Sequence, residues 1–291
     1  AGRFKRMAMA AERWLLRRFD RVSSISTRMI ERLEAKGVDV GKRALFPNWA
    51  DIDAIQPLVQ PSVYRRELGI PDGAVVALYS GNMGLKQGLE LLGEAARRLR
   101  TSSDIYFVLG GQGPGREALE AQCDGLPNVR FLGLQPTERL NDWLGLADIH
   151  LLPQRADVAD LVMPSKLTGM LASGRPVLAT ARPGTGVALA VQDSGRTVAP
   201  GDVDAFVEAL QALASDAALR ASLGHAARQQ ALDTLAREGI LRRFAFEKLV
   251  PFQRHVWEAM LDEAEAAIRD GEDRSIERRS LQWSTDAATG E

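Results

Sequence analysis

The residues best suited to chemistry lie at 163–168, where Met-Pro-Ser-Lys-Leu-Thr joins a polar loop to a short predicted helix. Pro164 is preorganised for a helix start, and Ser165 can cap free backbone N–H groups there. Because a helix N-terminus carries partial positive charge, this start and Lys166 together could hold a phosphate group. The alternative is an ordinary capped helix without a ligand, and for this stretch alone it is the better interpretation.

A second polar loop, 80–88, follows a predicted strand and contains Gly81, Asn82, Gly84 and Lys86. Glycines allow the backbone to approach a ligand closely, and Lys86 adds a charge beside a predicted helix start. The loop is not a Walker A motif, because no Gly-Lys-Ser/Thr sequence closes it.

A third loop, 110–115, is a glycine cluster that includes Gly111. Its spacing differs from the dinucleotide fingerprint, and a tight turn is at least as good an interpretation. Taken together, three loops at strand ends and two lysines favour an anionic ligand. A diphosphate attached to a larger group suits such a crevice.

The composition is that of a globular protein, with 45% hydrophobic residues, 26% charged residues and a formal net charge of -1. Such a balance gives no general attraction to nucleic acid. The single Cys123 leaves no intrachain disulfide, which agrees with a reducing cytoplasm. The three histidines lack the spacing of metal ligands, and we expect no metal site. No signal peptide is recognisable, and the start without Met suggests a fragment or truncated gene product.

Residues 3–21 are basic and amphipathic, with Trp14 and Phe19 among the arginines. A surface helix packed on a domain is one interpretation. A helix resting on an anionic membrane is the other, and both can hold together.

Strands and helices alternate through the middle of the chain. The expected strands are continuous apolar runs, typical of a parallel sheet covered on both faces. We therefore predict an α/β fold, a doubly wound Rossmann-like domain over 66–200. It is preceded by a linker at 52–65 and followed by helices at 201–269 and a disordered tail at 270–291. The strands are expected at 22–26, 43–46, 74–79, 105–109, 129–132, 148–152, 177–180 and 195–198.

An ordered set of short motifs carries a family resemblance over roughly residues 20–200. The motifs are Val22–Ser26, Pro47–Asp51, Tyr79–Gly84, Val129–Gly133, Ala147–Asp148 with Leu152–Pro153, Met163–Leu167 and Gly174–Val177. In this set the chain resembles the carboxyl-terminal half of a family 4, GT-B-fold glycosyltransferase of the colanic-acid and O-antigen subgroup.

The resemblance implies a nucleotide-sugar donor held by this half of the protein and an acceptor held by an amino-terminal Rossmann domain. Residues 1–51 would be the remnant of that acceptor domain. The implied reaction transfers sugar from a UDP- or GDP-sugar to a lipid-linked or other glycan acceptor, with retention of configuration and without cofactor or metal. The implied location is cytoplasmic, peripheral on the inner face of the plasma membrane. Self-association through residues 1–45 is a further expectation.

By position, the resemblance assigns most of the site residues. Gly81, Asn82 and Lys86 would contact the diphosphate, and backbone near Phe131 and Leu132 would hold the base. The residues assigned to the sugar and phosphates are Met163, Pro164, Ser165, Lys166 and Leu167.

Some residues depart from the family pattern. Many members carry an arginine near Asn82 and glutamates near 161 and at 169, whereas this chain has Leu161 and Gly169. The glutamate at 169 would bind the ribose hydroxyls, although Asp157 and Asp160 lie close by in sequence.

Three functions agree with these residues, in order of preference. The first is a retaining glycosyltransferase, and the second is a subunit or inactive remnant that binds nucleotide sugar without turning it over. The third is a GT-B-fold sugar-nucleotide epimerase. An epimerase needs titratable groups around the sugar, and none stands out among the histidines.

Overall fold

The computed structural model describes residues 2–102, 104–155 and 163–234. Within these ranges, no helix combines the length and the apolar character that crossing a bilayer requires.

The main sheet has six parallel strands in the order β5-β4-β3-β6-β7-β8. The chain adds β4 and β5 on one side of β3, then crosses over to add β6, β7 and β8 on the other side. This reversal of direction places a crevice above the carboxyl ends of β3 and β6, where ligands of doubly wound sheets bind. The strands are β3 (Val75–Ser80), β4 (Ile105–Gly110), β5 (Val129–Leu132), β6 (Ile149–Leu152), β7 (Val177–Thr180) and β8 (Gly195–Val198).

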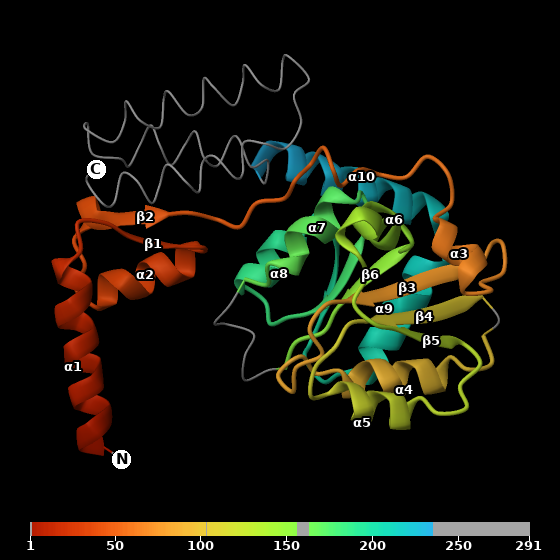
Figure 1. The fold of residues 1–291 in the computed structure, drawn as a ribbon, viewed down its shortest axis with the longest axis horizontal. Helices are drawn as coiled ribbons and strands as arrows, with labels where there is room; N and C mark the ends of the chain where they lie inside the picture. The colour runs from red at the N-terminus through yellow and green to blue at the C-terminus, as the bar shows by residue number, and fades with distance from the viewer. Residues whose placement is uncertain (1, 103, 156–162, 235–291) are drawn as a thin grey trace. The chain divides into compact units, whose positions relative to one another are not determined.

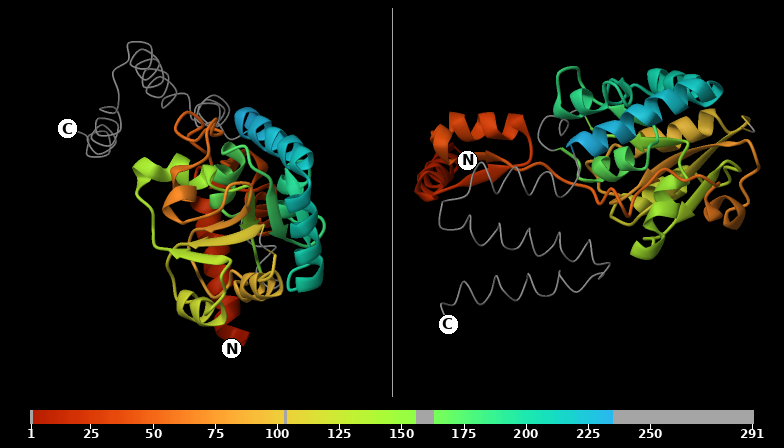
Figure 2. Two further views of the ribbon diagram at one scale, coloured as in Figure 1. Left: turned by 90° about the vertical axis from the view of Figure 1, so that its right-hand side faces the viewer. Right: turned by 90° about the horizontal axis from the view of Figure 1, so that it is seen from above.

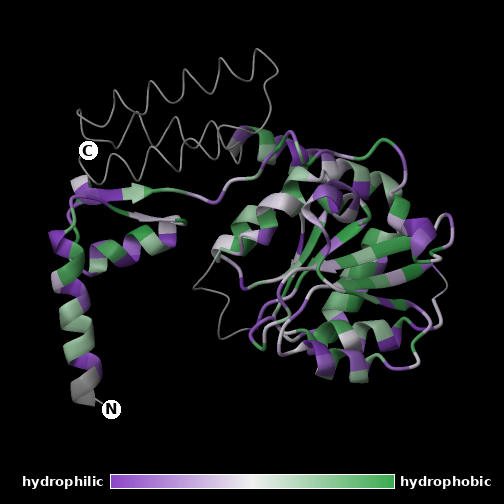
Figure 3. Cartoon of the chain, viewed as in Figure 1, coloured by the Kyte–Doolittle hydropathy of each residue, from purple (hydrophilic) through white to green (hydrophobic). Residues whose placement is uncertain are grey.

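Both faces of the sheet are covered by helices, as Figures 1 and 2 show. Side chains of β3 alternate between two cores: Val76 and Leu78 enter one, while Ala77 and Tyr79 enter the other. Strands β3, β4 and β7 are accordingly mostly apolar along their length (Figure 3). This arrangement confirms the predicted Rossmann-like, doubly wound α/β fold. The first core contains residues of α3 (Val63–Glu67), α6 (Leu140–Gly145), α7 (Lys166–Ala172), α8 (Gly186–Val191) and α10 (Ala217–Thr234), and the second contains residues of α4 (Glu90–Arg98), α5 (Arg116–Gln122) and α9 (Val203–Ser215).

The amino-terminal elements form a small unit of their own. Strands β1 (Val22–Ser24) and β2 (Arg43–Leu45) pair in parallel, joined through α2 (Thr27–Ala35) and a 3₁₀ turn at Val40–Lys42. Helix α1 (Gly2–Arg18) contacts this unit through an ion pair between Glu12 and Lys36. Lys42 Nζ also donates to the Arg17 carbonyl at 3.0 Å.

The segment expected to be a linker, 52–65, packs on the sheet domain. Ile55 and Tyr64 are buried, with 6% and 1% of their surface exposed. Ser62 Oγ donates to the Asp142 carbonyl at 2.7 Å, which ties the start of α3 to α6.

The predicted helices after residue 200 begin with α9 and α10, which are described as far as Thr234. The remainder of 201–269 and the tail at 270–291 lie outside the described residues. Two described helices, α3 and α8, were not expected from sequence, because five and six residues are too few to establish a helical period.

Candidate functional site

A cavity of about 800 Å³ opens where β3, β6 and α7 end or begin. Its walls come from five segments of the chain. These are Trp49, Ala50, Asp51 and Ile55 before α3; Ser80, Gly81, Asn82, Lys86 and Gln87 after β3; Leu140 and Leu144; Gln154; and Pro164, Ser165, Lys166, Thr168 and Gly169 of the α7 region.

Lys166 is the most unusual residue of this cavity. Its ammonium nitrogen Nζ is buried and has no hydrogen-bond partner among the described residues. Nζ lies 4.1 Å from the centroid of the Tyr79 ring, which offers a cation–π contact in place of an ion pair. Burial lowers the pKa of Lys166 from 10.5 to about 7.

The loop after β3 and the loop after β4 support each other through their backbones. Gly81 N donates to the Gly110 carbonyl at 3.0 Å, and Met83 N donates to the Gln112 carbonyl at 2.8 Å. At Gly111, φ is +140° and a Cβ atom would lie 1.8 Å from the Gly81 carbonyl oxygen. Glycine is therefore required there for packing between loops, one layer below the cavity wall.

Six residues predicted for the site line the cavity. They are Gly81, Asn82 and Lys86 of the first loop and Pro164, Ser165 and Lys166 of the α7 start. Lys86 is exposed.

The other predicted residues lie behind or beside this wall. Leu167 is buried in a core, and Met163 packs against the same core. Phe131 is partly buried, and the Leu132 carbonyl accepts from Arg116 Nη1 at 2.8 Å. Gly84 and Gly111 also lie outside the lining. Of the residues quoted for the departures, Gly169 lines the cavity, whereas Asp157, Asp160 and Leu161 lie outside the described residues.

Comparison with known proteins identifies the family. Residues 74–216 match the model of the glycosyl transferases group 1 family. The chain carries a group 1 glycosyl transferase domain. This domain contains the six-stranded sheet and 13 of the 17 residues that line the cavity; Trp49, Ala50, Asp51 and Ile55 precede it.

Similarity to curated proteins extends beyond this domain. A protein of Escherichia coli K12 named as a colanic acid biosynthesis glycosyl transferase, WcaI, is 38% identical over 84% of the chain and 60% of its own length. The D-inositol 3-phosphate glycosyltransferase of Streptomyces avermitilis is 28% identical, over 66% of the chain and 43% of its own length. The chain thus spans three-fifths or less of these two relatives.

Solved structures share the fold at low identity. HepE of Anabaena in complex with UDP aligns with a TM-score of 0.72 and 18% identity, over 84% of this chain and 67% of that one. The carboxyl-terminal domain of LpcC from Francisella tularensis gives a TM-score of 0.52 and 19% identity, over 65% of this chain and 99% of that one. These similarities confirm that the chain contains one half of a GT-B fold.

Several residues that line the cavity were not named as site residues from sequence. Ser80 Oγ accepts from Trp143 Nε1 at 2.8 Å, and Asp51 Oδ1 accepts from Ala54 N at 2.9 Å. Gln154 is buried, and its backbone N donates to Thr180 Oγ1 at 2.7 Å. The position of Gln154 directly after β6 was the available signal, since strand ends meet at one edge of a parallel sheet.

His150 lies fully buried in β6 of the transferase domain. Its Nε2 lies 2.9 Å from Ser173 Oγ, and Ser173 Oγ donates to the Met170 carbonyl, so Nε2 carries the hydrogen. Burial, with the nearby charges of Arg175 and Lys166, lowers the pKa of His150 to about 3. Its imidazole is therefore neutral at physiological pH and has a packing role.

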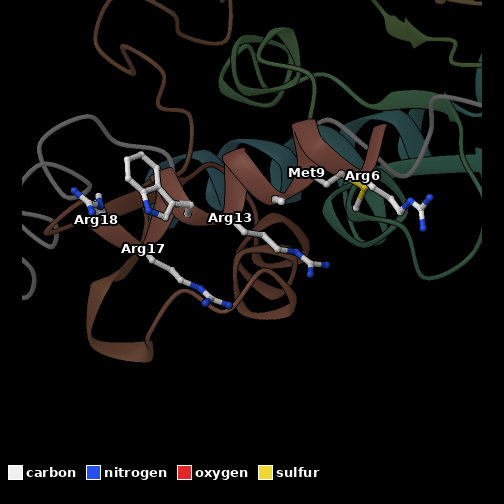
Figure 4. A pocket seen from close by; sticks show the side chains of 7 residues that line it. Arg6, Met9, Arg13, Arg17 and Arg18 are labelled. Carbon is white, nitrogen blue, oxygen red and sulfur yellow. The ribbon is translucent and has the colours of Figure 1, made fainter. Parts of the chain in front are cut away.

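A second hollow follows one side of α1, and Figure 4 shows its arginines extending from a single helix. Arg18 lies over the ring of Trp14, with its guanidinium carbon 4.1 Å from the ring centroid. Trp14 and Leu15 are half exposed, at 58% and 50%. The lining consists of Arg6, Met9, Ala10, Arg13, Trp14, Arg17 and Arg18.

Proposed function

We propose that this chain is the donor-binding half of a glycosyltransferase of bacterial surface polysaccharide synthesis. The donor is a UDP- or GDP-sugar, and the acceptor is a lipid-linked glycan. Support comes from the similarity to WcaI, named for colanic acid biosynthesis, and to LpsE of Rhizobium meliloti, named for lipopolysaccharide core biosynthesis. It also comes from the fold shared with HepE, whose structures contain UDP or UDP-glucose.

The observation that carries the proposal is the buried ammonium of Lys166, which has no hydrogen-bond partner among the described residues. A buried cation without an ion pair is costly, and an anion entering the cavity would remove this cost. Lys86 lines the same cavity and can contact the same anion. A diphosphate, with charge along its length, can meet both lysines at once.

The proposed chemistry is sugar transfer with retention of anomeric configuration. The bond between the anomeric carbon and the diphosphate breaks, and the acceptor hydroxyl forms a new bond on the same face of the sugar while losing its proton. Charge develops on the departing diphosphate, where Lys86 and Lys166 would stabilise it. The backbone near Phe131 and Leu132 is the proposed contact of the base.

Calorimetry with UDP, GDP and ADP tests the donor site. We expect at least one of them to bind, and both Lys86→Met and Lys166→Met to weaken the binding by about 1.5–3 kcal/mol, the range for hydrogen bonds to charged groups. Lys36→Met is the matched control, because Lys36 pairs with Glu12 away from the cavity lining. Binding that is absent for all three nucleotides at millimolar concentration would contradict the proposal. Equal affinity in wild type and both cavity variants would place the site elsewhere.

A donor-binding subunit without transferase activity is the second candidate. It is favoured by Gly169, which lines the cavity without offering a carboxylate to ribose. A Cβ atom at Gly169 would lie 3.2 Å from Leu144 Cδ1, so this part of the wall is apolar. Detection of UDP release from UDP-sugars, by the chain fused to the amino-terminal domain of a relative, separates the two candidates, since a binding subunit releases none.

We also propose that α1 attaches the protein to an anionic membrane on the cytoplasmic side, where lipid-linked acceptors are presented. Its exposed Trp14 and Leu15 can enter the interface while the arginines contact lipid phosphates. Glu12 is the one acidic residue within α1, and it is paired with Lys36.

Flotation with liposomes tests this attachment. The chain should float with vesicles rich in anionic lipid and remain below neutral vesicles, and Arg13→Gln with Arg17→Gln should reduce flotation. Arg28→Gln with Arg32→Gln, which removes two exposed charges from α2, is the control. Equal recovery with both lipid types would contradict the proposal.

A further inference from the structure

Lys166 and Tyr79 come from different elements and meet beneath the cavity. Lys166 is the first residue of α7, whereas Tyr79 is the penultimate residue of β3. The aliphatic stem of Lys166 runs past Gly81, where a Cβ atom would lie 3.4 Å from Lys166 Cδ. The stem ends with Nζ above the Tyr79 ring. Gly81 thus lies directly beside the stem of Lys166.

Tyr79 also contacts the loop that follows β3. Its hydroxyl donates to the Asn82 carbonyl at 2.6 Å. The side chain is 0% exposed and does not line the cavity, so it does not contact a ligand there. Its ring and its hydroxyl therefore serve two different wall segments, the α7 start and the Gly81–Asn82 turn.

We infer that Tyr79 is a positioning residue for the proposed donor site, with its ring holding Lys166 Nζ below the cavity and its hydroxyl fixing the Asn82 carbonyl. The inference rests on the proposed function for its biological meaning. The contact between the Lys166 ammonium and the Tyr79 ring can be tested without a ligand.

The ring should favour the charged form of Lys166. A cation is attracted to the face of an aromatic ring, whereas burial alone favours the neutral amine. Replacing the ring with an aliphatic side chain should therefore lower the pKa of Lys166 further. The described ionisable groups nearby are His150 of β6 and, in the cavity wall, Asp51 and Lys86. His150 is neutral above pH 6.

Nuclear magnetic resonance of ¹³Cε-labelled lysine in the full chain reads the Lys166 titration directly, with Lys166→Met identifying its signal. In wild type the midpoint should lie near pH 7. Tyr79→Leu should move the midpoint down by about 0.4–1.5 pH units, the equivalent of a lost cation–π contact. Tyr79→Phe keeps the ring and should have the same Lys166 midpoint as wild type.

Nucleotide binding gives the second measurement. A diphosphate beside Lys166 raises its pKa, so binding takes up a proton, and UDP affinity should fall as pH rises above about 7. At pH 8.5, Tyr79→Leu should bind UDP about 3- to 30-fold more weakly than Tyr79→Phe. Tyr79→Phe should itself bind about 2- to 12-fold more weakly than wild type at every pH, because it lacks the hydrogen bond to Asn82.

The outcomes separate the two ideas. A wild-type Lys166 midpoint near 10.5, or a folded Tyr79→Leu variant with an unchanged midpoint, overturns the positioning role whatever binds. Expected midpoints without nucleotide binding support the role of Tyr79 toward Lys166 and contradict the proposed function alone. Circular dichroism and thermal unfolding show whether each variant is folded. If Tyr79→Leu fails to fold, Tyr79→Met provides the ring-free variant.

Discussion

At the scale of single residues, two buried basic side chains of this domain differ in their surroundings. His150 and Lys166 are both basic groups with pKa values lowered by burial, to about 3 and about 7. His150 is hydrogen-bonded to Ser173 and remains neutral, whereas Lys166 titrates near neutral pH beside a cavity. Perturbed groups that border cavities are candidates for function, while similar groups inside a core serve packing.

The first prediction concerns His150 and pH. Its pKa is about 3 in the folded state and near 6.5 when unfolded. Below pH 6.5 the unfolded chain therefore binds a proton that the folded chain does not, and stability falls as pH drops toward 3. Between pH 7 and pH 5 this should remove about 2 kcal/mol. Lys166, with a pKa of about 7, completes its protonation in the upper part of this interval, and that contribution is the same in wild type and in a His150 variant.

Urea unfolding at pH 7 and pH 5 measures the effect. His150→Gln, which can keep a hydrogen bond to Ser173, should reduce the pH-dependent loss by about 2 kcal/mol. The control is His225→Gln, which removes an exposed imidazole from α10. An equal loss of stability in wild type and His150→Gln would show that His150 is not the group that titrates.

The second prediction concerns Gly111. Gly111→Ala places Cβ against the Gly81 carbonyl and requires φ near +140°. Gly73→Ala also requires a positive φ, of +83°, but no atom lies within 4 Å of its Cβ. Gly111→Ala should therefore be the less stable of the two by about 1–3 kcal/mol, the usual cost of overpacking. Equal unfolding midpoints in urea would contradict the contact between the loops.

At the scale of elements, part of the cavity wall is held on the sheet domain by hydrogen bonds from a residue distant in sequence. Arg228 of α10 donates to the carbonyls of Ile52, Ile55 and Ala172 at 2.7–2.9 Å. The same guanidinium thus joins α10, the carboxyl end of α7 and the segment before α3. Ile55 of that segment lines the cavity, so its position follows from Arg228.

The third prediction follows from this fastening. Arg228→Ala leaves three carbonyls without their partner and should destabilise the domain by at least the ~1.5–3 kcal/mol of a hydrogen bond to a charged group. It should also weaken nucleotide binding by loosening the wall around Ile55. Gln229→Ala, one position along α10 and exposed, provides the control in urea unfolding. An Arg228→Ala chain as stable as the control would mean that water replaces these bonds at no cost.

At the scale of the whole molecule, the chain spans 60% of the length of WcaI. The fourth prediction is that the chain alone binds nucleotide but transfers no sugar. Presenting both reactants in line can account for ~7–11 kcal/mol of a barrier, and an open half-cleft loses most of this. The measurement is product formation from a panel of nucleotide sugars and lipid-diphosphate acceptors.

The complementing experiment supplies an amino-terminal Rossmann domain from a relative, fused upstream, and should restore transfer. Specific transfer by the unfused chain would mean that the acceptor binds on the residues present here. Sedimentation of the unfused chain additionally tests self-association through residues 1–45, which stays a prediction.

Local patterns in the sequence were sufficient for the fold of the sheet domain. The apolar runs at 74–79 and 105–109 could be recognised as buried parallel strands because every residue in them faces a core. Pro164 and the glycines of the loop at 80–88 indicated a helix start and a close turn by their own backbone preferences. Six of the predicted site residues consequently line one cavity.

Contacts between distant residues were decided only by the tertiary structure. Tyr79 read as one more apolar strand residue, yet it meets Lys166, 87 positions later, because β3 and α7 are brought to the same edge of the sheet. Segment 52–65 read as a linker because its prolines obscure any period, while Arg228 and the core determine where it packs. The burial of the Lys166 ammonium depends on neighbours that are distant in sequence, and a local sequence pattern does not identify them.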